Sequence, residues 1–430
     1  MTRSLSNLKQ LSCHPSLVVG LVLIAILVGM SLYAVIAIPY SEAIGLWRDP
    51  GERVENPKFA RPVWFDLLTS DRLPRTIIVS SHDAGIVRIE SLDDNRELYE
   101  VVLPFSYQYD AFPSELTLST LVTGGEERTP VSVAWETETG DTILLGEYHA
   151  RQSHTYYISQ DGDLRDRLGM APHRGLFADL HDAGRMLKGD YRLVLRAEVP
   201  RDAEVEVRLV VYGQVHGPFG TDHMRRDLTV PMVWGAVVAL WFGILAALAF
   251  QLGNLLLALM GRRYRERVDP LFLRLTDVNT ILLLLPILIV ISHLYQLRIW
   301  VILASAIVLS GGMAVIKVLR AVFLPSVEVP HSGPAPASRA VMALLLPSFL
   351  LTVPAFVFLE AALGLFGLGD PFLPTWGNVL YDAFVQSALY HGHYYWILQP
   401  LLLLMVLGIG FAMAGYALHR IYNPRLQTER

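Results

Sequence analysis

Long apolar runs without charged residues are the feature of this sequence that most limits what it can fold into. A helix needs about 20 apolar residues to cross the hydrocarbon core of a bilayer. Runs of roughly this length occupy residues 17–38, 229–261, 278–297, 299–316, 340–368 and 396–418, with Glu360 inside the fifth. We therefore expect a membrane protein of the all-α class with six transmembrane helices.

Composition agrees with this expectation and excludes several other classes. Of the 430 residues, 53% are hydrophobic and only 17% are charged, which is not typical of a soluble domain. The formal net charge of -5 gives no basic excess, so no nucleic-acid partner is expected. The one cysteine, Cys13, excludes a disulfide framework within the chain and a cysteine-rich metal site.

Positively charged residues beside the apolar runs predict the orientation, because loops rich in Lys and Arg stay in the cytoplasm. Four clusters flank the runs: Arg3 and Lys9; Arg262, Arg263, Arg265 and Arg267; Lys317 and Arg320; and Arg420, Arg425 and Arg430. With six spans, all four lie on one side. We expect a multi-pass protein of the cell (inner) membrane with a cytoplasmic stub at 1–16, a cytoplasmic tail at 427–430, and residues 39–228 extracytoplasmic. The first run, 17–38, should be a retained anchor, because no cleavage site follows it before Pro39.

Residues 39–215 are rich in charged residues, Gly and Pro, and are expected to form a water-exposed, β-rich domain. In residues 204–209, apolar and charged side chains alternate, which places them on opposite faces of a half-buried strand. Similar runs occupy 76–81, 85–92, 115–122, 131–138, 142–150, 155–159 and 191–199. Such short strands with turn-rich connections predict a β-sandwich, with a jelly roll as one version of it, inserted between the first and second spans. Residues 164–187 would interrupt it as a helical or irregular segment.

No grouping of residues in the sequence predicts catalysis or a bound metal. The histidines of the outer domain, such as His149 and His154, form no His-x-x-x-His pair on an expected helix. Neither His-Glu-x-x-His nor Gly-x-Ser-x-Gly occurs beside the spans. We therefore expect no enzyme, and no catalytic, cofactor-binding or metal-ligating residue. For the outer domain, a carbohydrate- or peptide-binding face and a docking or spacer role are both open.

The segment that joins the outer domain to the second span carries a first family motif. Residues 216–228 read His-Gly-Pro-Phe-Gly-Thr-Asp-His-Met-Arg-Arg-Asp-Leu. This resembles the His-Pro-Leu-Gly-Thr-Asp-x-x-Gly-Arg-Asp-Val signature that precedes the second span in C-type permease subunits of dipeptide and oligopeptide (peptide/nickel) ABC importers. The matching positions are Gly220, Thr221, Asp222, Arg226 and Asp227, while Arg225 replaces the family's glycine.

Three more blocks resemble the same family in the same order. Residues 268–277 are similar to Val-Asp-x-x-x-Met-Arg-x-x-Asp at the third span, with Asp269, Arg274 and Asp277 as the matching positions. Residues 360–369 and 374–380 are similar to Glu-Ala-x-Leu-x-Phe-Leu-Gly-Leu-Gly and Pro-x-Trp-Gly-x-Met-Leu. The matching positions there are Glu360, Gly367, Gly369, Trp376 and Gly377. Residues 422–426 resemble the family's Asp-Pro-Arg-Leu after the last span.

The chemistry of the third block suits the end of a membrane span. Its glycines would let the chain turn sharply as it leaves the fifth span, and Trp376 suits the membrane interface. Because Glu360 lies near the outer end of its run, we favour a role in packing or at an interface over a proton relay.

The resemblance covers residues 216–430 and implies an inner-membrane component of binding-protein-dependent transport, with a permease core at 229–426 of the type I ABC importer kind. It implies the import of peptides or similar small solutes. The implied partners are a second permease subunit in a heterodimer, two ATP-binding subunits, an extracytoplasmic solute-binding protein and the lipid bilayer. This chain has no Gly-x-x-x-x-Gly-Lys-Ser/Thr loop, so ATP would be used by the partner subunits, and no cofactor would be bound here.

In the family, a loop between the fourth and fifth spans couples transport to ATP hydrolysis through a short helix. The positions matched to that loop are Glu328, Gly333, Arg339, Leu346 and Pro347. Pro330, Pro334 and Pro336 oppose a helix here, because a proline in a helix interior costs about 3 kcal/mol. The coupling helix could be shifted to 338–345, the ATPase could be engaged weakly, or it could be not engaged at all.

The proline-rich loop and the large outer domain also support an alternative. In this second hypothesis, the chain is a non-transporting six-span membrane protein whose extracytoplasmic domain has a structural or ligand-sensing role.

Overall fold

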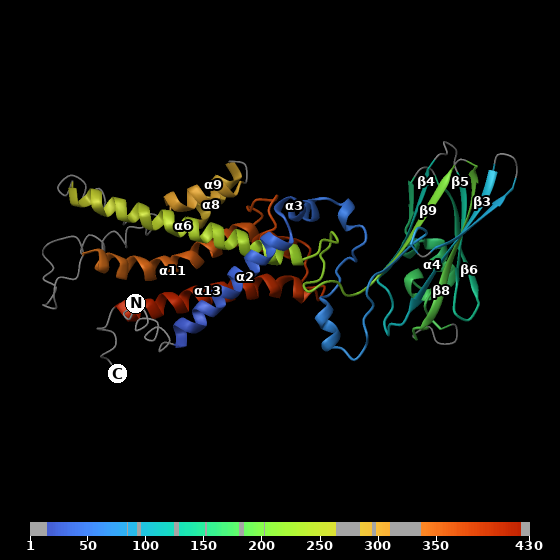
Figure 1. Ribbon diagram of the computed structural model, residues 1–430, viewed down its shortest axis with the longest axis horizontal. Coiled ribbons are helices and arrows are strands. Elements are labelled where there is room, and N and C mark those ends of the chain that lie inside the picture. Colours follow the sequence, from blue (N-terminus) through green and yellow to red (C-terminus); the bar gives the residue numbers. More distant parts are fainter. Residues whose placement is uncertain are drawn as a thin grey trace. The chain divides into compact units, whose positions relative to one another are not determined.

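The computed structural model describes residues 15–83, 85–92, 96–123, 129–150, 153–179, 185–201, 203–263, 284–294, 298–309 and 337–422. The chain divides into two compact units: a helical unit, Met1–Asp49 with Val230–Arg430, and a β unit, Pro50–Thr229 (Figure 1). The sequence-based division lies instead at 38/39 and at 228/229. The predicted positions Asp269, Arg274, Asp277, Glu328 and Gly333 lie outside the described residues.

Four of the helices in the described part of the chain are long and apolar enough to cross a membrane. They are α2 (Pro15–Ala37), α6 (Thr229–Arg263), α11 (Ala337–Leu365) and α13 (Tyr394–Tyr422). They coincide with the predicted first, second, fifth and sixth spans. Within the third and fourth predicted spans, the structure describes α8 (Leu284–Leu294) and α9 (Ile299–Leu309), each of 11 residues. This is a membrane α protein, and its described helices provide four candidates for the six expected spans.

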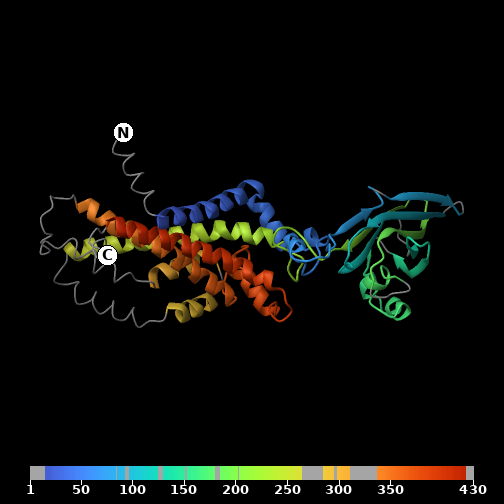
Figure 2. The ribbon, with the colours of Figure 1, turned by 90° about the horizontal axis from the view of Figure 1, so that it is seen from below.

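The long helices of the helical unit pack side by side (Figure 2). α13 contacts both α2 and α11, and the short helix α12 (Trp376–Val385) contacts α11 and α13. A further short helix, α3 (Tyr40–Arg48), follows α2, and its Ala43 shares an apolar cluster with Ala34 of α2 and Trp234 of α6. The Trp234 indole N–H donates to the Ile38 carbonyl at 3.1 Å, which ties the end of α2 to α6.

Close packing between α2 and α13 depends on a glycine. A Cβ atom added to Gly20 would lie 2.7 Å from both the Ala414 nitrogen and the Gly410 oxygen of α13, so no larger side chain fits there. Small residues allow this kind of close helix approach within a membrane. Gly29, on the same helix, has nothing within 4 Å of an added Cβ atom.

The β unit contains two antiparallel sheets among the described residues (Figure 1). One has the strand order β1 (Ile77–Ser80), β9 (Glu204–Tyr212), β4 (Glu115–Thr123), β7 (Ser153–Tyr156). The other has the order β2 (Ile86–Ser91), β3 (Arg96–Tyr107), β8 (Gly189–Pro200), β5 (Thr129–Glu136), β6 (Thr142–Ala150). Short helices occupy Gly51–Arg53 (η1), Val63–Leu67 (η2), Ile158–Gln160 (η3), Gly162–Leu168 (α4) and Pro172–Gly175 (α5).

Side chains from both sheets form one hydrophobic core. In β9, the alternation seen in the sequence is also the burial pattern, since Val205 and Val207 are buried and Glu206 is exposed. Trp135 of β5 is fully buried, and its indole N–H donates to the Leu176 carbonyl at 3.2 Å. Rings from three other segments surround Trp135: Phe105, Phe177 and Tyr191. This aromatic cluster connects β3, β5 and β8 with the segment after α5.

Strand β3 was not predicted, because Pro104 interrupts its pattern. Leu92 donates its N–H to the Arg96 carbonyl at 3.1 Å, so the even-numbered residues of β3 point their backbone groups toward β2. Val102 is the last residue of β3 that pairs with β2. On the other side of β3, the pairing with β8 continues, and Pro104 lies opposite Arg192. Pro104, which has no N–H, therefore lies past the part of β3 that pairs with β2, a position in a sheet where proline is tolerated.

The Gly20 contact leads to a prediction about stability. Gly20→Val should destabilise the packing of α2 on α13 by about 1–3 kcal/mol, since overpacking moves neighbouring atoms. In detergent, the midpoint of thermal unfolding should fall for this variant. Gly29→Val adds the same side chain to an open position of the same helix and should leave the midpoint near that of the wild type. Equal midpoints for the two variants would contradict this packing.

Candidate functional site: the α11–α12 turn and an aromatic pocket

The chain leaves α11 through a compact turn in which glycine is required. Gly367 has φ of +73°, in the left-handed region. Its N–H donates to the Gly364 carbonyl at 2.8 Å, and the Leu368 N–H donates to the Leu363 carbonyl at 2.9 Å. These two bonds form a Schellman motif, which satisfies the last carbonyls of the helix. The turn therefore ends α11 at a defined residue and directs the chain back toward α12.

Helices α11 and α12 touch through their backbones. A Cβ atom on Gly364 would lie 2.7 Å from the Gly377 Cα atom, and one on Gly377 would lie 2.9 Å from the Ala361 oxygen. Gly369 is similarly confined, because a Cβ atom there would lie 2.5 Å from Oδ1 of Asn378. Of these glycines, Gly369 and Gly377 are predicted family positions, and both occupy places where no side chain fits.

Polar side chains hold the loop between the two helices. Asn378 donates from Nδ2 to the Asp370 carbonyl at 2.7 Å and to the Leu373 carbonyl at 3.0 Å. Thr375 is the N-cap of α12, and its Oγ1 accepts from the Asn378 N–H at 3.3 Å. The carboxyl group of Glu360, buried within α11, is hydrogen-bonded to the same Thr375 side chain. Glu360 thus lies in the packing between α11 and the start of α12.

Trp376 fixes α12 to α6. Its indole N–H donates to the Met232 carbonyl at 3.0 Å, and its side chain is buried. The ring lies so close to Gly235 that a Cβ atom on this glycine would be 2.3 Å from the indole. The contacts of Trp376 thus place the start of α12, and the loop before it, against the start of α6.

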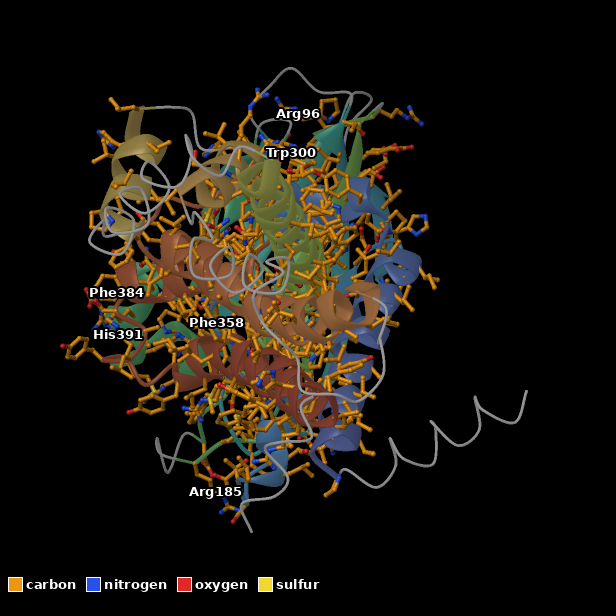
Figure 3. All side chains as sticks on the ribbon, turned by 90° about the vertical axis from the view of Figure 1, so that its left-hand side faces the viewer. Arg96, Arg185, Trp300, Phe358, Phe384 and His391 are labelled. Carbon is orange, nitrogen blue, oxygen red and sulfur yellow. The ribbon has the colours of Figure 1, made fainter. Side chains whose placement is uncertain are left out.

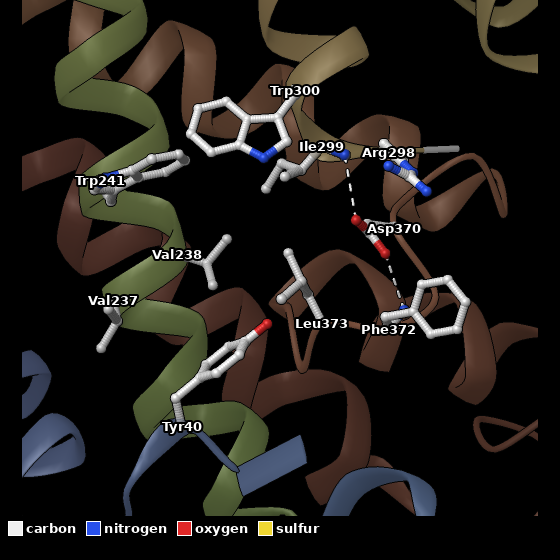
Figure 4. A pocket seen from close by; sticks show the side chains of 10 residues that line it. All are labelled: Tyr40, Val237, Val238, Trp241, Arg298, Ile299, Trp300, Asp370, Phe372 and Leu373. Carbon is white, nitrogen blue, oxygen red and sulfur yellow. Dashed lines mark hydrogen bonds between the residues drawn. The ribbon is translucent and has the colours of Figure 1, made fainter. Parts of the chain in front are cut away.

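A pocket of about 510 Å³ opens beside this loop (Figure 4). α6 contributes Trp241, α9 contributes Trp300, and α3 contributes Tyr40. The Trp241 and Trp300 rings meet edge to face, with their centroids 4.8 Å apart. The remaining lining residues are Val237, Val238, Arg298, Ile299, Asp370, Phe372 and Leu373. Its volume lies in the ordinary range of small-molecule sites, and its walls are mostly aromatic and aliphatic.

Asp370 is the acidic group of this pocket. Its Oδ2 atom accepts from the Ile299 N–H at 3.3 Å, and its Oδ1 atom accepts from the Phe372 N–H at 3.0 Å (Figure 4). Asp370 therefore connects the start of α9 with the loop after α11. The Arg298 side chain is exposed at the same pocket, so groups of both charges face it.

Apolar side chains are also exposed at another part of the helical unit. Phe384 is 73% exposed and Tyr390 is 90% exposed. Phe384 and His391 lie at the periphery of the unit (Figure 3). Exposed aromatic residues at the ends of spans are typical of a membrane interface.

The first family motif forms a closed loop within the β unit. The buried Thr221 donates its hydroxyl to the Pro57 carbonyl at 2.6 Å and accepts the Ala60 N–H at 2.9 Å. The fully buried Asp222 pairs through Oδ2 with Nε of Arg226, and its Oδ1 accepts the Arg226 N–H at 2.9 Å. Thr221 thus ties the motif to the segment 56–61, and Asp222 and Arg226 pair within the motif.

Asp227 and Arg225 complete this loop. Burial raises the pKa of Asp227, but hydrogen bonds from His216 and Thr229 outweigh burial, so that its pKa lies below the ordinary value. Oδ1 of Asp227 accepts the Thr229 N–H at 2.7 Å, at the first residue of α6. Arg225, at the position of the family's glycine, has φ of +63° and pairs with Glu115 while its guanidinium lies 4.2 Å from the Tyr212 ring centroid.

Three predicted coupling residues fall on α11. Arg339, Leu346 and Pro347 all lie within this helix, and residues 338–345 form part of its first turns. Leu346 is half-buried, and Pro347 is buried inside the helix. Neither Leu346 nor Pro347 is among the residues that line the pocket.

Several residues of the site gave no signal in the sequence. Trp241, Trp300 and Asp370 come from distant segments, and only the fold brings them together. Thr375 could have been found, because a threonine just before the apolar run of α12 is an N-cap pattern. Among the residues that the structure describes, no group of three or more His, Cys, Asp or Glu side chains could hold a metal ion.

The fold and site thus define a membrane protein of packed apolar helices with a pocket between them. No protein-family model matches the chain. The dipeptide transport system permease protein of Alkalihalophilus pseudofirmus is 26% identical over 225 residues, which cover 49% of this chain and 72% of that protein. The di/tripeptide transport system permease protein of Pseudomonas aeruginosa is 27% identical over 235 residues, which cover 50% of this chain and 75% of that protein. The oligopeptide transport system permease protein of Bacillus subtilis is 24% identical over 228 residues, which cover 49% of this chain and 72% of that protein.

These relatives confirm the resemblance to C-type peptide permeases that the motif blocks predicted. Together with the four long apolar helices, they show a multi-pass membrane protein of the transport-permease type.

The glycine contacts of the turn generate a second prediction. Gly377→Val should separate α12 from α11, because the added side chain would meet the Ala361 oxygen and the Gly364 backbone. We expect a loss of about 1–3 kcal/mol in stability, measured by thermal unfolding in detergent. Gly253→Val on α6 has nothing within 4 Å of its new Cβ atom and serves as the control. A Gly377→Val protein as stable as this control would show that the contact is unimportant.

The buried Asp222–Arg226 pair generates a third prediction. Asp222→Asn keeps the size and one acceptor but leaves the Arg226 charge without its buried carboxylate, which costs about 3–5 kcal/mol. Hydrogen exchange followed by mass spectrometry should show faster exchange of the amides of 56–61 and 220–228. Glu206→Gln, on the exposed face of β9, provides a control that should leave these amides protected. Unchanged protection in Asp222→Asn would exclude a structural role for the pair.

Proposed function

We propose that this chain is a permease subunit of an ABC transporter that imports peptides or similar small solutes. The observation that carries this proposal is the similarity to peptide transport permease proteins over about half of the chain. The close-packed α11–α12 turn supports it, because its packing explains why glycine occupies positions 369 and 377 and tryptophan occupies position 376 of the matching block. The relatives do not favour the non-transporting alternative.

The proposed subunit has six spans, both termini in the cytoplasm and residues 39–228 outside. Its segments are the stub 1–16, the first span 17–38, an extracytoplasmic β-sandwich at 39–215, the motif segment 216–228, the permease core 229–426 and the tail 427–430. The positively charged clusters in the sequence support this orientation. In this arrangement, the pocket lies near the outer ends of α6 and α9.

The proposed partners are a second permease subunit, two ATP-binding subunits and an extracytoplasmic solute-binding protein. This chain would hydrolyse no ATP itself and would bind no cofactor. Its half of the pathway would open and close by movement between alternative packings of the helices. We propose Glu328, Gly333, Arg339, Leu346 and Pro347 as the region that contacts an ATP-binding subunit.

The aromatic pocket is proposed to contact the solute. A peptide carries a positive amino terminus and a negative carboxyl terminus, and Asp370 and Arg298 supply one group of each charge at the pocket. Trp241 and Trp300 would cover the apolar parts of the solute. Backbone N–H groups hold both oxygens of Asp370 in place without neutralising its charge.

The complex itself provides the test of this function. A tagged chain, purified from its own host in mild detergent, should retain a second permease and ATP-hydrolysing chains, which mass spectrometry would identify. The purified complex should hydrolyse ATP faster when a solute-binding protein and a peptide are added. A chain that repeatedly purifies without any ATP-hydrolysing subunit would overturn the proposal.

The pocket gives a prediction for transport. Trp300→Ala should lower the uptake of a labelled dipeptide by roughly ten-fold, since lost aromatic contact is worth about 1–1.5 kcal/mol. Trp300 is 59% exposed, so the fold should survive its removal. Tyr390→Ala removes an even more exposed aromatic ring away from the pocket and is the matched control. Equal uptake by the two variants would show that the pocket takes no part in transport.

A further inference from the structure

Two adjacent leucines and a tryptophan are exposed on the segment around η2 (Val63–Leu67). Leu67 is 86% exposed and Leu68 is 71% exposed, the two largest values for large apolar side chains in the described part of the β unit. Trp64 is 45% exposed. Residues three apart lie on one face of a 3₁₀-helix, so Trp64 and Leu67 share a face. An exposed apolar patch of this kind marks a place where a protein meets a partner or a membrane.

This segment lies beside the residue at which α6 begins. The Val63 N–H donates to the Gly217 carbonyl at 2.9 Å. The Trp64 indole N–H donates to the Pro218 carbonyl at 3.0 Å. Gly217 in turn adjoins Thr229, because a Cβ atom added to Gly217 would lie 3.5 Å from the Thr229 Oγ1 atom. Thr229 is the first residue of α6, one of the helices long and apolar enough to cross a membrane. The exposed leucines therefore lie close to the point at which the chain enters the bilayer.

Several polar groups of the segment are already paired, which lowers the cost of moving it out of water. The Phe65 N–H donates to the Pro62 carbonyl at 3.0 Å, and the Leu68 N–H donates to the Phe65 carbonyl at 2.9 Å. The Trp64 side chain has one polar group, its N–H, and this group is bonded to the Pro218 carbonyl. Unpaired backbone groups are what make irregular segments costly in an apolar medium. The side chains of this segment can therefore contact lipid while its backbone bonds stay intact.

We propose that the η2 segment inserts into the surface of the lipid leaflet that α6 enters, and so anchors the β unit at the membrane. Leu67 and Leu68 would reach the boundary between headgroups and acyl chains, about 5–10 Å deep. Trp64 would lie at the level of the headgroups, where tryptophan is enriched. The proposal rests on α6 as a membrane span and not on the transported solute. In the proposed orientation of the chain, this leaflet is the outer one.

Charged residues beside the segment suit lipid headgroups. Arg61 and Arg72 are exposed on either side of η2, and Asp71 is exposed beside Arg72. Zwitterionic headgroups carry a phosphate and a positive group, so both signs of charge find a counterpart at a bilayer surface. Long arginine side chains can extend their charge to this level while their stems contact apolar groups. Asp66, the charged residue of η2 itself, is half-buried and has its Oδ1 atom buried, so it is not among the most exposed side chains.

Quenchers carried by the lipid test the insertion directly. Cys13 is the only cysteine of the chain, so Cys13→Ser provides a background for single-cysteine variants of the full-length protein. Leu67→Cys is labelled with a polarity-sensitive fluorophore, and the protein is reconstituted alone into phosphatidylcholine vesicles. The emission of the label should shift to the blue. Lipid with a doxyl spin label near the headgroup should quench it more strongly than lipid with the spin label at the end of the acyl chain.

Ile89→Cys provides a matched control for the label. Ile89 is 55% exposed, but it belongs to β2 of the five-stranded sheet, whereas β9, which leads into the motif segment, belongs to the four-stranded sheet. Its label should be quenched by iodide in the water and by neither spin-labelled lipid. The comparison separates insertion of the η2 segment from a general attraction of the fluorophore to vesicles.

An added charge tests whether apolar contact causes the insertion. Leu68→Asp, combined with Leu67→Cys, should abolish the quenching by lipid and return the emission to that of the label in water, because a carboxylate below the headgroups is costly. Ser70→Asp places the same charge at an exposed polar position of the same loop. Combined with Leu67→Cys, it should leave the quenching near that of the parent variant.

Quenching of the Leu67→Cys label by lipid, its loss with Leu68→Asp and its retention with Ser70→Asp support the proposal. A label at position 67 that only iodide quenches would overturn it. So would a label shielded from both iodide and lipid, which would be covered by protein, or equal quenching by lipid at positions 67 and 89. Circular dichroism of every variant checks that the β unit is folded. None of these readouts depends on ATP or on solute uptake, so the insertion can fail while the proposed function holds, and the reverse.

Discussion

The requirement that backbone polar groups find partners inside the hydrocarbon core shapes the helical unit. Long helices satisfy this requirement through their own hydrogen bonds. They then associate through close van der Waals packing, because an apolar side chain is as favourably placed against lipid as against another helix. Gly20 meets α13 in this way, and Gly364 meets Gly377. The second contact is the one on which the site depends, since it brings α12 and its preceding loop against α11 and α6. Asp370 and the pocket are placed by the same loop.

The sequence predicted those elements whose signal is local. Apolar length identified α2, α6, α11 and α13, and alternation identified β9. β3 escaped prediction because Pro104 interrupts the pattern, although Pro104 lies past the residues of β3 that pair with β2 and still lies opposite Arg192 of β8. The site was predicted only where a motif marked it, as at Gly369 and Trp376. Trp241, Trp300 and Asp370 could not be grouped from the sequence, because their proximity comes from the packing of separate helices.

The two described motif regions have a common physical character. Asp222 and Arg226 neutralise each other within a buried loop, and Glu360 is bonded to the cap of α12. In each case the polar side chains find their partners inside the protein, so they hold a turn in place instead of facing a ligand. The groups that face open space at the pocket, Trp300 and Arg298, lie outside the motif blocks. The resemblance to peptide permeases therefore accounts for how the turns are held, whereas Trp300 and Arg298 owe their place at the pocket to the packing of separate helices.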